Sequence, residues 1–315
     1  MAAPSAAGRI LRRTFMYAIL GATGHTGSVI ANKLLEKGKK VRVFGRDAKK
    51  LDPFARRGAE MATGDVTDGA KLAQVFAGAE AVYAMLPPSM TTADYRAYQD
   101  QVTDAIAKAI EAAGVKNAVV LSSIGADKAE KTGPVAGLHN LETRLGKIKG
   151  LNALYLRAGY FMENTLTQTE IIKNFGMMAG PVRADLPLPL IATHDIGEFA
   201  ANALLELKFT GQQTQELLGP RDVSYDEIAK IAGAAIGKPS LAYVQLPNEQ
   251  VIQAMVSMGM SKNLASLICE MSDALNSGHM KALEQRSAKS STPTAFEKFV
   301  QQAFLPAYSG KAASA

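Results

Sequence analysis

Short apolar runs and longer amphipathic segments follow one another along the first half of the chain. Apolar runs bounded by turn residues predict buried strands, and longer segments with apolar residues at helical spacing predict helices. The predicted strands are residues 17–20, 41–44, 59–63, 81–86, 118–121 and 153–156. The predicted helices between them are residues 25–37, 49–57, 69–77, 95–113 and 138–149.

Six strands that alternate with helices over about 140 residues predict a parallel sheet with helices on both faces. After Arg157 the alternation stops. The rest of the pattern predicts helices at residues 164–174, 195–207, 225–236, 249–258 and 262–277, strands at 215–218 and 242–245, and loop or short strands at 179–191. The expected fold class is α/β, a doubly wound parallel Rossmann sheet with a smaller, mostly helical C-terminal substrate domain.

The same pattern divides the chain into three parts. Residues 1–15 contain no acidic residue and are expected to form a flexible basic tail. Residues 16–160 are expected to form the Rossmann domain. Residues 161–308 are expected to form a substrate-side domain that is partly packed on the sheet, before a frayed end.

A glycine-rich loop follows the first predicted strand and opens the first predicted helix. Gly21 permits a tight turn, Gly24 lets a pyrophosphate approach the backbone, and Gly27 lets the helix pack close to the strand. The helix N-terminus then offers free N–H groups to the phosphates. This context favours a dinucleotide site over glycines that only serve a turn. The loop residues expected at the cofactor are Gly21, Thr23, Gly24, His25, Thr26 and Gly27.

The end of the second predicted strand carries a base where NAD-binding proteins carry an acid. Arg46 stands at this position, and Lys49 and Lys50 follow. Arginine binds phosphate through a fork of donors, and lysine adds a point charge. Arg46 and Lys50 therefore predict a 2′-phosphate site and the cofactor NADP(H). Asp47 is interpreted as a helix cap, and a solvated basic turn is the alternative interpretation of the segment.

Further candidates lie at the ends of the third, fourth and fifth strands, where open α/β sheets bind ligands. Asp65 is expected to accept from an adenine amino group, although Gly-Asp is also common in turns. The prolines after the fourth strand would form a rigid wall, and a serine after the fifth would bind nicotinamide or substrate, or else cap a turn. The cofactor candidates at these ends are Gly64, Asp65, Val66, Leu86, Pro87 and Ser122.

The formal net charge of +6 is concentrated in two segments. Residues 1–15 contain three basic residues and no acid, and residues 39–57 contain eight basic and two acidic residues. The excess therefore surrounds the predicted phosphate site, which favours a phosphorylated cofactor. Aromatic residues make up 6% of the chain, tryptophan is absent and no nucleic-acid motif is found, so a nucleic-acid partner is not expected.

No apolar stretch is long enough for a membrane helix, so no membrane partner is expected. One cysteine, Cys269, cannot form an internal disulfide, which favours a reduced compartment. We expect a cytoplasmic protein, with organelle targeting by residues 1–15 left open. The four histidines share no ligand spacing, so no metal site is expected.

Several of these motifs together resemble the NmrA-like family of atypical short-chain dehydrogenases/reductases, from Met16 to about residue 305. The resemblance implies an NADP-binding Rossmann fold. Members are similar either to NADP-dependent quinone, triphenylmethane-dye and phenylpropanoid reductases or to redox-sensing regulators that bind dinucleotide without known turnover. The motifs are residues 21–27, Arg46, residues 64–65, His139 with Glu142, and residues 156–164, 193–197 and 218–220.

The resemblance also implies roles for residues near the nicotinamide. Backbone near Gly159 and Tyr160 is expected at the cofactor, and Tyr160 with Asn164 is expected to position the acceptor. His139 stands where some relatives carry a catalytic Lys or His. Its proton could serve catalysis, and a histidine that packs or caps its helix is the alternative interpretation.

One departure from ordinary short-chain dehydrogenases limits the chemistry. None of the nine tyrosines has a lysine four residues later, so the usual acid–base pair is missing. Electron-poor acceptors such as quinones need little acid help. We therefore expect an NADPH-dependent reductase of a small apolar acceptor, catalysed by His139, Tyr160 and Asn164. The alternative is a non-catalytic NADP(H) sensor. A homodimer or a regulatory protein partner is compatible with either function.

Overall fold

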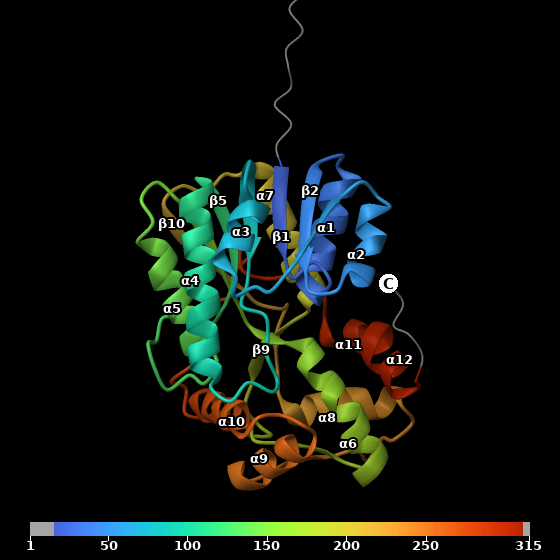
Figure 1. Cartoon of the computed structure of the whole chain (residues 1–315). Coiled ribbons are helices and arrows are strands. Elements are labelled where there is room, and N and C mark those ends of the chain that lie inside the picture. Colours follow the sequence, from blue (N-terminus) through green and yellow to red (C-terminus); the bar gives the residue numbers. More distant parts are fainter. Residues whose placement is uncertain (1–15, 311–315) are drawn as a thin grey trace, which may run out of the picture.

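The computed structural model describes residues 16–310 (Figure 1). The predicted basic tail at residues 1–15 lies outside the described residues, and so do residues 311–315 at the end of the chain. Among residues 16–310, no helix is long and apolar enough to cross a bilayer.

A seven-stranded parallel sheet forms the centre of the first half, in the order β10-β6-β5-β4-β1-β2-β3. All six predicted strands are present. The seventh strand, β10, comes from the second half and pairs with β6. The strands are β1 Met16–Leu20, β2 Lys40–Gly45, β3 Glu60–Thr63, β4 Ala79–Ala84, β5 Asn117–Ser123, β6 Asn152–Ala158 and β10 Gln212–Leu217.

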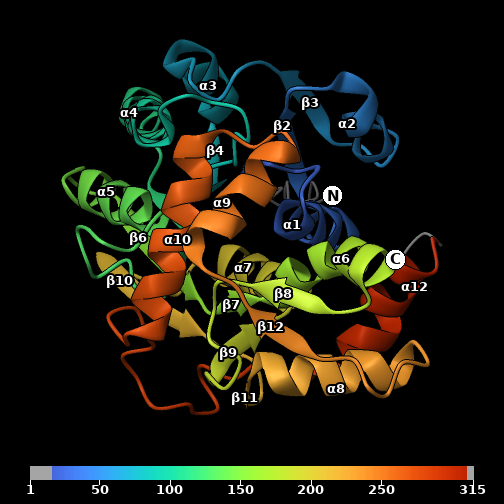
Figure 2. The same cartoon turned by 90° about the horizontal axis from the view of Figure 1, so that it is seen from below.

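Helices cover both faces of this sheet, as the pattern predicts (Figure 2). One face carries α1 His25–Glu36, α2 Ala48–Ala55 and α7 Thr193–Glu206, and the other carries α3 Gly69–Phe76, α4 Tyr95–Ala113 and α5 Val135–Gly146. Strand β1 is buried on both sides because its side chains alternate. Tyr17 and Ile19 join the core under α1 and α7. Ala18 and Leu20 join the core under α3 and α4.

The remaining elements lie at the carboxyl ends of the strands (Figure 1). A small sheet contains β7 Tyr160–Phe161, β9 Leu188–Ile191 and β11 Asp222–Val223, and a second pairs β8 Met178–Gly180 with β12 Tyr243–Gln245. The helices are η1 Met162–Thr167, α6 Gln168–Phe175, α8 Tyr225–Ala235, α9 Asn248–Ser257, α10 Lys262–Asn276, α11 Phe296–Phe299, η2 Val300–Phe304 and α12 Leu305–Tyr308. A separate hydrophobic core holds this half together.

The central sheet extends beyond the predicted boundary at residue 160. Both α7 and β10 follow that residue, yet they belong to the sheet and its helical cover. Gly197 in α7 makes the contact close, because a Cβ there would lie 2.6 Å from the Cβ of Val29 in α1. The chain therefore leaves the sheet at the end of β6 and returns to it.

Candidate functional site

The glycine loop is built as a strand-to-helix turn that only glycine permits at two positions. Gly21 has φ +63°, which disfavours other residues. The N–H of Gly24 donates to its carbonyl at 2.9 Å. A Cβ at Gly27 would lie 2.3 Å from the same carbonyl oxygen. Gly27 therefore sets the close approach of α1 to β1 that the spacing predicts.

Gly24 differs from the other two because its outer face is open. A Cβ there would meet only the Gly21 carbonyl oxygen, at 3.3 Å. Gly24 is the N-cap of α1, no side chain among residues 16–310 caps that helix end, and Thr23 and His25 beside it are exposed. The uncapped N–H groups and the helix dipole favour an anion at this place.

The structure turns the side chain of Thr26 away from this open face. Thr26 is 7% exposed, and its hydroxyl lies 2.8 Å from the phenol oxygen of Tyr83 in β4. Burial raises the pKa of Tyr83 well above its ordinary value, so that phenol stays protonated. The Thr26 side chain therefore fastens the loop to β4, and any cofactor contact at this position comes from the backbone.

Arg46 lies exposed just beyond the end of β2. Within residues 16–310, no carboxylate lies within ion-pair distance of its guanidinium. Lys49 and Lys50 are also exposed, on the first turn of α2. Asp47 is the cap of α2, because its carboxylate accepts from the Lys49 N–H at 2.9 Å. The predicted cap is confirmed, and Arg46 is available to a ligand.

The nearby Arg42, in contrast, is used inside the protein. Its Nη2 pairs with Glu60 at 2.7 Å, and its Nη1 donates to the carbonyls of Val75 and Ala77 at 2.7 and 3.0 Å. Arg42 therefore joins β2 to β3 and to the end of α3.

Asp65 follows β3 and adopts the turn role that the sequence left open. Its Oδ1 accepts from the N–H and the hydroxyl of Thr67 at 2.8 and 2.7 Å. These bonds, and to a smaller extent the charge of Arg46, lower the pKa of Asp65. Its Oδ2 has no hydrogen-bond partner among residues 16–310. Val66, in contrast, is 8% exposed and packs in the core, so its side chain offers a ligand little surface.

Tyr98 in α4 belongs to the same region, although no motif in the sequence points to it. Its hydroxyl donates to the carbonyl of Pro87 at 3.1 Å. Burial raises the pKa of Tyr98, and the charges of Arg46 and Asp65 also act on it. A helix residue is placed here only by the packing of α4 against the sheet, which no local pattern reports.

The segment after β4 lies against the glycine loop, as the carboxyl ends of parallel strands should. A Cβ at Gly21 would lie 3.1 Å from the sulfur of Met85. Leu86 and Pro87 follow and are partly buried. Gly64, at the end of β3, faces the Phe44 ring, which would lie 3.3 Å from a Cβ there. The predicted strand ends therefore meet at one side of the sheet.

Ser122 does not face this region with its hydroxyl. Its Oγ donates to Glu142 of α5 at 2.6 Å. Arg157 of β6 holds the same carboxylate through two bonds, of 3.0 and 2.6 Å. Both charged side chains are 14% exposed or less, and the carboxylate raises the pKa of Arg157. The predicted cofactor contact by Ser122 is replaced by a buried network that fastens α5 to the sheet.

His139 makes contacts typical of a packed helix histidine. Its Nδ1 lies 2.9 Å from the carbonyl oxygen of Ala126, so Nδ1 must carry the hydrogen. Its Nε2 lies 3.5 Å from the hydroxyl of Thr143, one turn further along α5. No hydrogen bond joins His139 to Tyr160 or Asn164.

The structure does bring Tyr160 and Asn164 together. Burial raises the pKa of Tyr160, and the nearby side chains of Tyr225 and Asn164 oppose this shift. The hydroxyl of Tyr160 lies 3.0 Å from that of Tyr225, which stacks on Tyr243. Asn164 is exposed. Tyr160 is therefore a protonated phenol that is fixed between the helical half and a solvent-facing amide.

Gly159, just before Tyr160, is fixed by the small sheet. A Cβ at Gly159 would lie 2.1 Å from the carbonyl oxygen of Pro189 in β9, and its N–H donates to Leu217 at 2.9 Å. The close approach explains why glycine stands here, and it leaves that N–H unavailable to a ligand.

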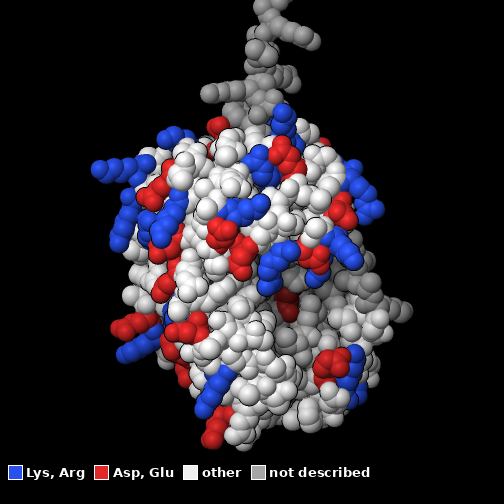
Figure 3. Space-filling model, viewed as in Figure 1, with Lys and Arg blue, Asp and Glu red and all other residues white. Residues whose placement is uncertain are grey.

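On the face drawn in Figure 3, a hollow lies between the upper and lower parts of the molecule, with basic side chains above it and an acidic side chain within it. Within residues 16–310, no three His, Cys, Asp or Glu side chains are grouped so that they could hold a metal ion.

The parallel sheet, its order and the glycine loop define a doubly wound α/β protein of the Rossmann type. Residues 16–300 match the NmrA-like family, and the chain belongs to that family. It is 29% identical to the NAD(P)H azoreductase of Xenophilus azovorans over 260 residues, which are 81% of this chain and 86% of the relative.

Two solved structures share the fold. The NADPH-dependent quinone oxidoreductase of Escherichia coli, complexed with NADPH, superposes with a TM-score of 0.77 at 22% identity, covering 92% of this chain and all of the other. The negative transcriptional regulator NmrA, in complex with NADP, superposes with a TM-score of 0.68 at 16% identity, covering 95% and 98% of the two chains. Similarity at this level of identity establishes the fold.

Proposed function

We propose that this protein is an NADPH-dependent reductase of a small, apolar, electron-poor acceptor such as a quinone. The observation that carries the proposal is the open face of Gly24 at the uncapped N-terminus of α1, with the exposed Arg46 at the neighbouring strand end. A dinucleotide placed with its pyrophosphate at Gly24 would extend its adenosine ribose toward β2.

The side chains at the end of β2 favour a phosphorylated ribose. Arg46 has no ion-pair partner among residues 16–310, and Lys50 adds positive charge. Asp47, the residue that could accept from a 2′-hydroxyl, holds the first turn of α2 instead. Asp65 and Tyr98 would border the adenine, with Oδ2 of Asp65 as the acceptor. The azoreductase, quinone oxidoreductase and NmrA named above bind or use nicotinamide cofactors, which supports the same choice.

The chain's own residues would bind and orient the reactants, while bound NADPH would supply the hydride. Tyr160 and Asn164 would hydrogen-bond the acceptor, because the phenol is protonated and the amide faces solvent. We propose a packing role for His139, since its Nδ1 donates to the Ala126 carbonyl. An electron-poor acceptor fits a site that has no dedicated proton donor.

A non-catalytic NADP(H) sensor is the second candidate. The missing Tyr-x-x-x-Lys pair and the similarity to NmrA favour it. Both candidates require the same cofactor site, so cofactor binding alone does not separate them.

Oxidation of NADPH across a panel of quinones, azo dyes and triphenylmethane dyes separates the two functions. We expect turnover with at least one acceptor, measured as the loss of the nicotinamide absorbance of NADPH. Tyr160→Phe should lower kcat/KM, because it removes a donor to the acceptor. Tight NADPH binding without turnover of any acceptor would favour the sensor.

A further inference from the structure

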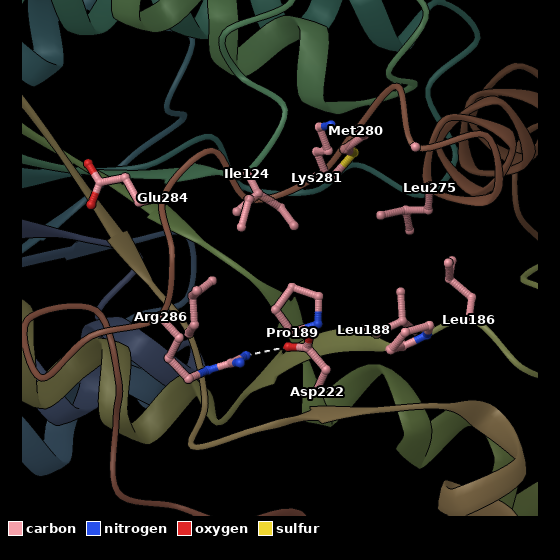
Figure 4. A pocket seen from close by; sticks show the side chains of 14 residues that line it. Ile124, Leu186, Leu188, Pro189, Asp222, Leu275, Met280, Lys281, Glu284 and Arg286 are labelled. Carbon is pink, nitrogen blue, oxygen red and sulfur yellow. Dashed lines mark hydrogen bonds and ion pairs between the residues drawn. The ribbon is translucent and has the colours of Figure 1, made fainter.

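A second pocket, of about 280 Å³, lies at the carboxyl ends of β5 and β10 (Figure 4). Apolar side chains that are 5% exposed or less contribute to its lining, namely Ile124, Leu188, Leu218, Leu275 and Met280. Its volume is close to the lower end of the range for small-molecule sites, roughly 300–1,000 Å³. The size and lining suit a molecule of one or two apolar rings.

One end of this pocket is polar. Arg286 donates from Nε to the Gly219 carbonyl at 2.8 Å and pairs through Nη2 with Oδ1 of Asp222. Figure 4 shows the pair beside Pro189. Among residues 16–310, Nη1 of Arg286 and Oδ2 of Asp222 have no hydrogen-bond partner. A donor and an acceptor therefore stand together, and their charges cancel.

The wall that carries Arg286 is fixed from inside the protein. Glu216 in β10 is 4% exposed, and its carboxylate accepts from the N–H groups of Leu283 and Glu284 at 2.8 and 3.1 Å. Backbone held by two charge-assisted bonds keeps this side of the pocket in place without a ligand.

The pocket is distinct from the proposed cofactor site. None of the residues that line it belongs to the glycine loop, to the end of β2 or to the Tyr160–Asn164 pair. It nevertheless adjoins the end of β6, because Pro189 packs on Gly159 and the N–H of Ile124 donates to Ala158 at 2.9 Å.

We propose that this pocket binds a small neutral ring compound with a hydroxyl or carbonyl group at one end. The rings would lie on the buried apolar side chains. The hydroxyl would donate to Asp222 and accept from Arg286, whereas a carbonyl would accept from Arg286. A neutral ligand suits this end because the ion pair has no net charge to balance an ion.

Binding of 2-naphthol and of naphthalene tests the proposal, measured from the fluorescence of each probe. The chain has no tryptophan, so protein emission interferes little. We expect saturable 1:1 binding of 2-naphthol, equal with and without NADPH. Ala282→Phe should remove binding of both probes, because Ala282 lines the pocket. Ala288→Phe, on the same segment but exposed and outside the pocket, should bind both as the parent does.

Arg286→Met separates the polar end from the apolar lining. The affinity for 2-naphthol should fall about tenfold or more, the loss expected for a hydrogen bond to a charged group. The affinity for naphthalene should change less than twofold. Arg221→Met, at an ion-paired arginine outside the pocket, should change neither.

Absence of saturable binding to the parent, or equal binding by the Ala282 and Ala288 variants, would overturn the proposed site. An equal loss of affinity for both probes in Arg286→Met would overturn the assignment of the polar end. These readouts need no turnover, so they stand or fall independently of the proposed reductase activity.

Discussion

Replacement of Gly24 by valine should abolish cofactor binding while leaving the fold intact. The backbone of Gly24 is extended, with φ −91° and ψ 174°, a conformation that valine accepts. A Cβ there meets only one atom, the Gly21 carbonyl oxygen at 3.3 Å. The cost to folding should therefore be about 1 kcal/mol, the usual penalty for an apolar residue at a helix N-cap.

The cost to binding should be much larger. Valine would occupy the face at which a pyrophosphate reaches the loop N–H groups. A hydrogen bond to a charged group contributes about 1.5–3 kcal/mol, so the loss of two gives about 3–6 kcal/mol. Affinity should fall by a factor of at least about 100 for both NADPH and NADH.

Gly27→Ala provides the structural comparison. Its Cβ would lie 2.3 Å from the Gly21 oxygen, so the helix must shift, and overpacking of this kind costs about 1–3 kcal/mol. Thermal unfolding followed by circular dichroism and titration of both cofactors measure the two effects. Near-parent affinity in Gly24→Val would refute the interpretation of the loop.

Three other substitutions test the surroundings of the site. Glu142→Gln leaves Arg157 buried without its charge partner, so urea unfolding should show a loss of about 3 kcal/mol, whereas the exposed Glu111→Gln should change little. His139→Gln should lower the unfolding free energy by about 1 kcal/mol and change kcat less than about twofold; a loss of about 100-fold, typical of a general acid, would restore His139 as a proton donor. The folded-state pKa of Asp65 is lowered, so its contribution to stability is present above about pH 4 and is lost as pH falls further. Asp65→Asn should therefore make the loss of stability with falling pH less steep in that range. An unchanged pH dependence would count against the Thr67 bonds as the cause of the lowered pKa.

Local patterns were sufficient to predict the strands and helices of the first half. Buried apolar runs and glycine-bounded helices are properties of neighbouring residues, and β1 to β6 follow them closely. For β10, the pattern predicts a strand at residues 215–218 between helices but assigns it no neighbour in the sheet. Its place beside β6 depends on the route of the chain through the second half, which no local pattern contains.

The site divides in the same way. Backbone roles such as those of Gly21 and Gly27 were predictable, because a turn and a close approach select glycine itself. The directions of the Thr26 and Ser122 side chains were not, because each depends on the partner across the core, the phenol of Tyr83 and the carboxylate of Glu142.

The preference of Arg46 for a 2′-phosphate is the most direct test of the account. Dissociation constants for NADPH and NADH should be measured for the parent, for Arg46→Ala and for Arg56→Ala, a neighbouring exposed arginine at the end of α2. We predict that Arg46→Ala weakens the binding of NADPH by about 1.5–3 kcal/mol and leaves the binding of NADH nearly unchanged. Arg56→Ala should alter the binding of neither cofactor. Equal weakening of both cofactors, or no weakening of NADPH, would contradict the account.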